Sequence, residues 1–245
     1  MGVEHLWADD AIVQWLTRNQ YHPRSSKHGN YLCERVLADL IFSCKKLREH
    51  AAQGKIVYKL NHTVNPNSRL RWTIDLVIGP SHDANPGANA NGLPRREDPA
   101  EIWLAIDTKS IMTEHAKARR NRLRDLKALD DLLHGSDSKT VVGGLVLINI
   151  SPTFHSPLRT NGPTKHRNVD RLTRESIEML ETLPRADHES HRPGLEAIGI
   201  IVVSHTNKSG DRTRLIGEPP APSESDLTHY HKFLGDLCRY YTERF

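Results

Sequence analysis

The chain has 245 residues, enough to bury one large hydrophobic core, and its 37% hydrophobic and 26% charged content is typical of a soluble globular protein. No apolar run reaches membrane-spanning length and the N-terminus lacks a basic and apolar signal pattern, so we expect a cytoplasmic location. A net charge of +4 permits nucleic-acid binding without requiring it.

Several classes of chemistry find no support in the sequence. There is no Walker loop, no Gly-x-Gly-x-x-Gly and no Gly-x-Ser-x-Gly, which leaves nucleotide hydrolysis, dinucleotide redox chemistry and α/β-hydrolase chemistry without a motif. The cysteines, Cys33, Cys44 and Cys238, lack metal-site spacing. Their low, odd number predicts reduced thiols and no disulfide framework.

The first part of the chain is predicted to be helical. Residues 5–20 place apolar side chains at helical spacing, and a stronger helix is expected from Asn30 to Ala52, ended by Gly54. Glu34 lies early in that second helix. It is either a candidate site residue or an ordinary exposed acid near a helix N-terminus.

Two hydrophobic strands follow, over residues 55–62 and 70–79, and the second carries Asp75 in its middle. Residues 80–99 are rich in Gly, Pro, Asn and Asp, which predicts a long loop. This loop joins the second strand to the third, so it begins near any site that those strands share.

The third strand, Glu101–Lys109, is apolar from Ile102 to Ile106 and then ends on Asp107 and Lys109. Side chains alternate across a strand, so these two charged groups point to the same face. Burying a carboxylate and an ammonium at the edge of a core costs several kcal/mol (~3–5) unless each has a partner. We therefore expect a functional site here, with a structural salt bridge as the alternative.

Asp75 and the run Asp107-Thr108-Lys109 resemble the PD-(D/E)xK motif of restriction endonucleases and related nucleases, over about residues 29–150. The resemblance implies one α/β domain over residues 1–245, with a restriction-endonuclease-like core of helix, three-stranded meander, helix and further strand. We expect a central mixed β-sheet of about five strands flanked by helices. Ile74 stands where the family has proline, and 31 residues separate the two acids, toward the long end for this motif.

The resemblance also implies an activity, that of a Mg²⁺-dependent endodeoxyribonuclease of the type II restriction kind, with Mn²⁺ able to substitute. Asp75 and Asp107 would hold the metal, with the Thr108 carbonyl as an extra ligand, and Lys109 would assist the attacking water. The first core helix of the family often lends a glutamate, for which Glu34 is the catalytic and metal-binding candidate. Cutting both strands of DNA implies a homodimer.

Residues 110–133 predict a helix with Thr113 as its N-cap. Its first half holds the densest positive patch of the chain: Lys117, Arg119, Arg120, Arg122, Arg124 and Lys127. We expect contacts to the phosphates of double-stranded DNA from this helix, and from Arg95 and Arg96 in the 80–99 loop. A solvated helix face and a disordered insertion are the respective alternatives.

The last part of the chain predicts a buried strand over 140–150, an irregular stretch over 151–168, a helix over 169–183, a strand over 195–204 and a closing helix over 223–244. Two other functions remain open. One is a nuclease subunit of a larger bacterial defence or repair complex, which differs only in its partners. The other is a non-catalytic DNA-binding subunit with a retained nuclease fold, against which the full Asp, Asp, Lys set argues.

Overall fold

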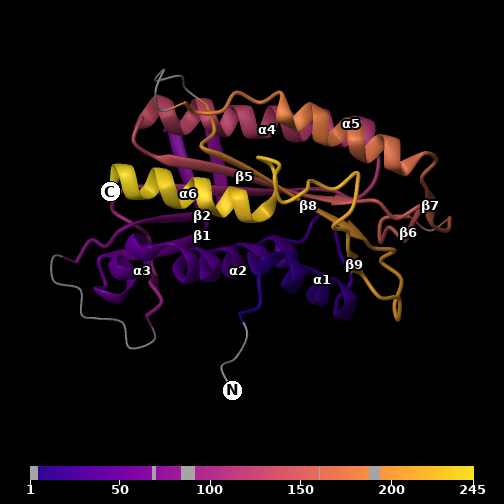
Figure 1. The fold of residues 1–245 in the computed structure, drawn as a ribbon, viewed down its shortest axis with the longest axis horizontal. Helices are drawn as coiled ribbons and strands as arrows, with labels where there is room; N and C mark the ends of the chain where they lie inside the picture. The colour runs from indigo at the N-terminus through magenta and orange to yellow at the C-terminus, as the bar shows by residue number, and fades with distance from the viewer. Residues whose placement is uncertain (1–4, 68–69, 84–91, 160, 188–193) are drawn as a thin grey trace.

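A computed structural model describes residues 5–67, 70–83, 92–159, 161–187 and 194–245. Within these ranges a seven-stranded mixed sheet separates two layers of helices (Figure 1). The strand order is β3-β1-β2-β4-β5-β8-β9. The strands are β1 (Ile56–Asn67), β2 (Leu70–Pro80), β3 (Arg95–Arg96), β4 (Leu104–Ile111), β5 (Val141–Asn149), β8 (Ala197–Ser204) and β9 (Arg214–Leu215).

The α/β class and the central mixed sheet agree with the sequence prediction, but the strand count does not. The five long strands were predicted, whereas β3 and β9 were not. Each of these edge strands has two residues, which is too short to show the period-two alternation on which strand prediction depends. A separate hairpin, β6 (Thr153–Phe154) with β7 (Thr164–Lys165), lies in the predicted irregular stretch.

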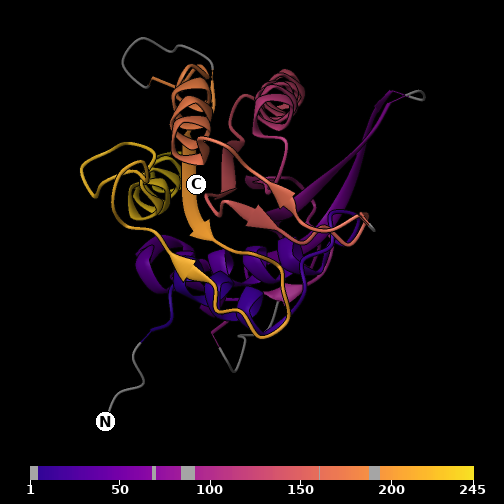
Figure 2. The same cartoon turned by 90° about the vertical axis from the view of Figure 1, so that its right-hand side faces the viewer.

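The strands divide into an antiparallel half and a parallel half. β1, β2 and β4 form a meander, and the β1–β2 hairpin extends as a long ribbon beyond the rest of the sheet (Figure 2). β4, β5 and β8 are parallel. Every residue of β5 is buried, as expected for a central parallel strand with helices on both faces.

Helices cover the two faces unequally. On one face lie α1 (Ala8–Arg18), α2 (Lys27–Ser43), α3 (Lys45–Ala52) and α6 (Tyr230–Arg244), which share a core with Leu76, Ile106 and Leu145. On the other lie α4 (His115–Ser136) and α5 (Val169–Glu181), which pack on Ala105, Val142 and Ile198. The two layers are separate in both ribbon views (Figures 1 and 2).

Three local predictions were wrong. The helix expected over Asn30–Ala52 begins at Lys27 and breaks at Cys44, whose backbone is extended. Cys44 is buried against α6 and forms a disulfide with Cys238, 194 positions away, so two of the three cysteines are not reduced thiols. Thr113 is not a helix cap: Glu114, in the left-handed region at φ 52°, precedes α4 and makes no side-chain capping bond.

Candidate functional site

The two aspartates of the motif lie where β2 and β4 separate. The ladder between these strands runs from Ile78↔Leu104 to Leu76↔Ile106 and then stops, one residue before Asp75 and Asp107 would pair. Thr108 links the two strands here: its backbone N–H and its hydroxyl both donate hydrogen bonds to Asp75 Oδ2, at 2.8 and 2.7 Å. Asp75 is therefore fixed against the neighbouring strand through one of its two oxygens.

Asp107 is completely buried, and its closest charged partner is Lys109. The Lys109 Nζ atom lies 2.5 Å from Asp107 Oδ2, as expected for side chains two residues apart on one strand face. The approach is close but poorly directed, and neither Asp107 oxygen has a well-formed hydrogen bond to any residue that the structure describes. The carboxylate thus has a charge partner and unused hydrogen-bonding capacity.

The surroundings hold Asp107 near the middle of its titration at neutral pH. Burial raises the pKa of Asp107, the Lys109 ammonium opposes this shift, and the neighbouring Asp75 carboxylate raises the pKa further, to about 7. Desolvation and a nearby like charge are two of the means by which functional sites tune their acids. The contribution of Asp75 to this shift indicates that the two carboxylates lie close enough to interact.

Helix α2 closes the site from the other face of the sheet. A Cβ atom on Gly29 would lie 3.3 Å from Thr108 Oγ1, so the helix approaches β4 closely at this glycine. Cys33, one turn later, is fully buried, and burial raises its pKa well above the ordinary value, with a further increase from Asp75. Gly29 lets the helix approach the strand, and the buried Cys33 excludes water. The lower local dielectric strengthens the electrostatic interaction between the carboxylates.

Two more residues surround the site that sequence reasoning missed. Burial lowers the pKa of His28, which the charge of Asp75 opposes, and His28 Nδ1 is buried without a hydrogen bond to a described residue. Tyr21 packs on the His28 ring and shares a 2.8 Å hydrogen bond with Ser110 on β4. The sequence predicted a polar loop here, because the segment contains Pro23, two serines and basic residues. The structure instead begins α2 at Lys27, which places His28 on the helix and against the site.

Glu34 does not join the two aspartates. Successive helix residues point about 100° apart, so α2 cannot present both Cys33 and Glu34 to β4. Glu34 is half-exposed, lies 3.7 Å from Arg96, and lines a cavity of about 410 Å³ near Tyr58. Across the described ranges, no three His, Cys, Asp or Glu side chains form a group suited to a metal ion.

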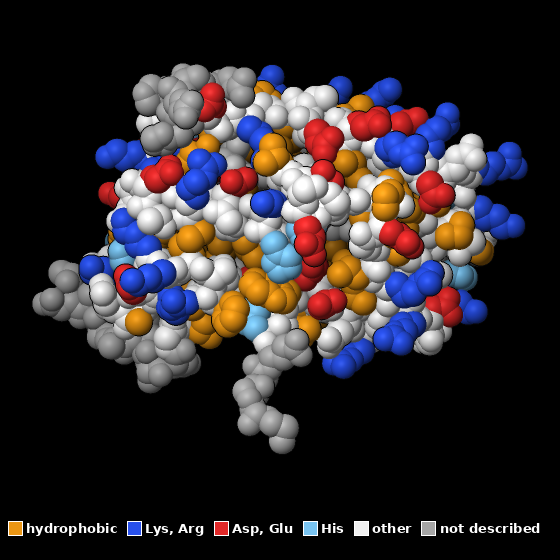
Figure 3. All heavy atoms as spheres, in the orientation of Figure 1, with side chains coloured by type: hydrophobic (Ala, Val, Ile, Leu, Met, Phe, Trp, Pro, Cys, Tyr) orange, Lys and Arg blue, Asp and Glu red, His pale blue; other side chains and the backbone are white. Residues whose placement is uncertain are grey.

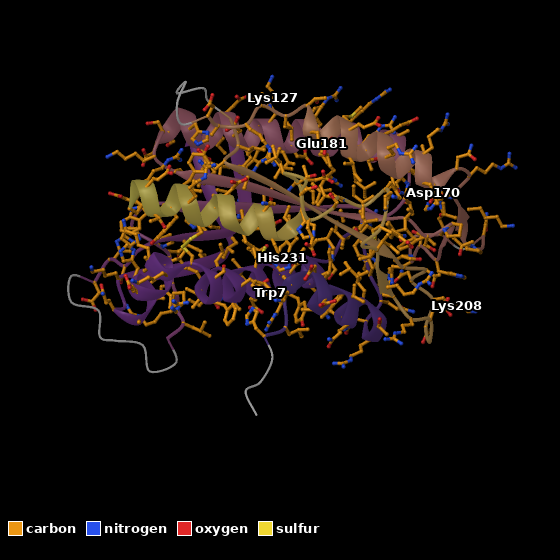
Figure 4. All side chains as sticks on the ribbon, in the orientation of Figure 1. Trp7, Lys127, Asp170, Glu181, Lys208 and His231 are labelled. Atoms are coloured by element: carbon orange, nitrogen blue, oxygen red, sulfur yellow. A yellow bond between two sulfur atoms is a disulfide. The ribbon has the colours of Figure 1, made fainter. Side chains whose placement is uncertain are left out.

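The basic residues expected to contact DNA fall into two groups. Some are engaged in ion pairs: Arg119 with Glu175 at 2.7 Å, Arg122 with Asp125 at 2.8 Å, Arg95 with Glu97 at 2.9 Å, and Arg96 with Glu34. Others are exposed on α4: Lys117, Arg120, Arg124 and Lys127. Figure 3 shows basic side chains along the edge of the molecule formed by α4 and α5, and Figure 4 labels Lys127 there.

Arg122 connects this helix with the end of β4. Its Nε donates to the Ser110 carbonyl at 3.3 Å, and Ser110 also bonds to Tyr21. The positive charge of Arg122 therefore lies beside the strand that carries Asp107 and Lys109. Among the basic residues of α4, this is the one that the structure links directly to that strand.

The donor set fits a hard divalent cation. The candidate ligand oxygens are those of Asp107, of which Oδ2 now pairs with the Lys109 ammonium, and the Asp75 carboxylate, whose Oδ2 accepts two hydrogen bonds from Thr108. In an extended strand the N–H and C=O of one residue point to the same side, so the Thr108 carbonyl also faces Asp75. Mg²⁺ commonly takes one or two carboxylates and fills its other positions with water and substrate phosphate.

Three comparisons, with protein-family models, with curated proteins and with solved structures, gave no match for this chain. Among the described residues, no helix is both long and apolar enough to cross a membrane. What the molecule does must therefore be argued from the chemistry of the β2–β4 site.

Proposed function

We propose that this chain is a cytoplasmic, Mg²⁺-dependent endodeoxyribonuclease of the PD-(D/E)xK, restriction-endonuclease type. One observation carries the proposal: a fully buried carboxylate, Asp107, is paired with a single ammonium, that of Lys109, and is close enough to Asp75 for the like charge to raise its pKa. A buried charge of this kind is unfavourable unless something compensates it. A divalent cation supplies that compensation.

The order of elements supports the proposal. Helix α2 precedes the β1–β2–β4 meander, and α4 then leads to β5, which is parallel to β4. This is the helix, meander, helix and strand order that the sequence resemblance implies. The motif residues lie on the two strands, β2 and β4, on which that resemblance requires them.

Each residue of the site has a role in this reaction. Asp75, Asp107 and the Thr108 carbonyl would hold Mg²⁺, which polarises the phosphate and lowers the pKa of a bound water. With a cation bound to Asp107, the Lys109 ammonium would no longer be needed to compensate that carboxylate. It could then orient the attacking water or stabilise negative charge on the phosphate oxygens.

The substrate proposed is double-stranded DNA. The exposed basic side chains of α4, Lys117, Arg120 and Arg124, follow β4 directly in the chain and offer positive charge to a phosphate backbone. Arg122 extends that charge to the end of β4. Cleavage of both strands would require a second active site, which we assign to a second copy of the chain.

Cleavage of DNA tests the proposal directly. The chain is incubated with supercoiled plasmids and with methylated and unmethylated genomic DNA, with Mg²⁺, with Mn²⁺ and with EDTA. We expect metal-dependent cleavage that leaves 5′-phosphate ends and is lost in Asp107→Asn and Lys109→Ala. Glu34→Gln is the matched control, because Glu34 is an acid of the same helix-covered region that does not reach the site.

Two outcomes would count against a nuclease. Cleavage that survives in Asp107→Asn would remove the assigned site. Tight DNA binding without cleavage of any substrate would favour a non-catalytic DNA-binding subunit, in which Asp107 and Lys109 form a structural ion pair.

A further inference from the structure

Two histidines meet on the α4 side of the molecule, outside the proposed nuclease site. His115 is the first residue of α4 and is 1% exposed, and His166 directly follows β7. Their ring centroids lie 5.0 Å apart and the ring planes are nearly perpendicular. Neither residue was singled out by spacing, because 50 positions separate them in the sequence.

Each ring has one nitrogen bound to a backbone carbonyl. His115 Nε2 lies 2.7 Å from the Asn149 oxygen, and His166 Nδ1 lies 2.9 Å from the Ser151 oxygen. A carbonyl only accepts, so each of these nitrogens carries the hydrogen. In a neutral ring the other nitrogen, His115 Nδ1 or His166 Nε2, then presents a lone pair.

Both of these lone-pair nitrogens are buried, and neither has a hydrogen-bond partner in the part of the chain that the structure describes. Leaving a buried acceptor unsatisfied costs about 1–3 kcal/mol, and here the cost arises twice within one contact. Histidines that bind metals in proteins almost always donate their other ring N–H to a carbonyl or a carboxylate. Both rings have this arrangement.

We propose that His115 and His166 bind a divalent transition-metal ion of the zinc class at the carboxyl end of β5. Two imidazoles on one tetrahedral zinc ion, with Zn–N bonds of about 2.1 Å, have ring centroids roughly 5 Å apart. Imidazole suits Zn²⁺, Ni²⁺ and Cu²⁺, whereas Mg²⁺ prefers oxygen. The ion therefore differs in kind from the one assigned to Asp75 and Asp107.

Water would supply most of the remaining ligands, and one nearby hydroxyl could hydrogen-bond to it. Thr164 precedes His166 by two positions, so its side chain points to the same side of the extended segment, and Thr164 Oγ1 is buried without a partner among the described residues. No third His, Cys, Asp or Glu of those residues completes the group. A site with two protein nitrogens leaves the other positions on the ion to water, one more than a catalytic zinc site with three protein ligands does.

The guanidinium of Arg119 lies near the pair, so charge alone does not favour a cation there. Burial lowers the pKa of His115, the hydrogen bond to the Asn149 carbonyl opposes this, and the nearby His166 and Arg119 lower it further. An anion would need protonated rings, while a metal needs neutral ones. The charge of Arg119 is compensated by Glu175, whose carboxylate lies 2.7 Å from the guanidinium.

Zinc titration tests the site without reference to nuclease activity. The metal-free full chain is titrated with Zn²⁺ in a calorimeter, and its melting temperature is measured with and without Zn²⁺. We expect one specific site that raises the melting temperature. His166→Gln, which is only partly buried and should fold, must weaken that binding at least about tenfold and remove the shift.

The control is His231→Gln. His231 also lies beside another histidine, since its ring centroid is 5.5 Å from that of His229. It is exposed and packs on the edge of Trp7 (Figure 4). His229 Nδ1 already accepts the backbone N–H of His231. This variant should bind Zn²⁺ as the unmodified chain does. Unchanged Zn²⁺ affinity in both His166→Gln and His115→Gln, or no Zn²⁺, Ni²⁺ or Cu²⁺ binding in the unmodified chain, would overturn the proposal.

Discussion

Two buried carboxylates lie at different strands of the parallel half of the sheet, and their surroundings differ. Glu196, just before β8, accepts the Val142 N–H at 2.7 Å, the Arg244 guanidinium at 2.6 Å and His134 Nε2 at 3.3 Å. Asp107, on β4, has an ammonium at 2.5 Å and no well-formed hydrogen bond among the described residues. Both side chains are almost wholly buried.

The titration of the two regions follows this difference. Burial lowers the pKa of His134, but hydrogen bonds to Asp130 and Glu196 outweigh it and raise the pKa to about 10, so His134 is a permanent cation at neutral pH. On β4, burial raises the pKa of Asp107 to about 7, so that its carboxyl is only partly ionised at neutral pH. A satisfied group of charges stabilises the fold, whereas an unsatisfied one is suited to a ligand.

The largest expected effect separates the two regions by activity. Asp107→Asn and Lys109→Ala should each lower the rate of Mg²⁺-dependent plasmid cleavage by about 1,000-fold or more, because both the cation site and the charge-stabilising ammonium are required. His134→Gln should leave the rate within about twofold at a temperature where it is folded. A similar loss in all three variants would mean that the two regions do not differ in function.

Stability should show the opposite ranking. Glu196→Gln leaves the cations of Arg244 and His134 without their shared partner, so we expect unfolding to become easier by about 3–5 kcal/mol. Urea denaturation measures this change. Glu34→Gln, which removes a half-exposed acid 3.7 Å from its cation, should change stability by less than about 1 kcal/mol. Equal effects of the two variants would contradict the account.

Asp107→Asn should stabilise the protein, on the order of 1–3 kcal/mol above pH 7. A carboxyl whose pKa rises from 3.8 to about 7 on folding binds its proton more tightly in the native state. Its contribution to stability therefore falls as the pH rises from about 4 through 7. The free energy of unfolding of variant and parent is measured by urea denaturation from pH 4 to 8. The advantage of the variant should grow along that range. A constant or reversed difference would show that the ionised Asp107 carboxylate does not destabilise the fold.

Much of this comparison was predictable from local sequence. The alternation that sets Asp107 and Lys109 on one face, and the hydrophobic runs around Asp75, are properties of single strands. The geometry confirms that Asp107 and Lys109 approach each other. Both strands were found at nearly the expected residues.

The parts that failed depend on contacts between distant segments. Which face of α2 meets β4 is set by packing, so the sequence offered Glu34 where the structure presents Cys33 and Gly29. The Cys44–Cys238 disulfide and the His115–His166 pair join residues far apart in the chain. The group around Glu196 likewise draws on three separate elements.

The central claim is that the buried carboxylate of Asp107, which pairs with Lys109 in the chain alone, binds a divalent cation. Calorimetric titration of Mg²⁺ into the full chain, at pH 8 and pH 6, tests it most directly. We predict binding at pH 8 that weakens by up to about tenfold for each unit below pH 7, that is absent in Asp107→Asn and that is unchanged in Glu34→Gln. Equal Mg²⁺ affinity in the parent and in Asp107→Asn would contradict the account.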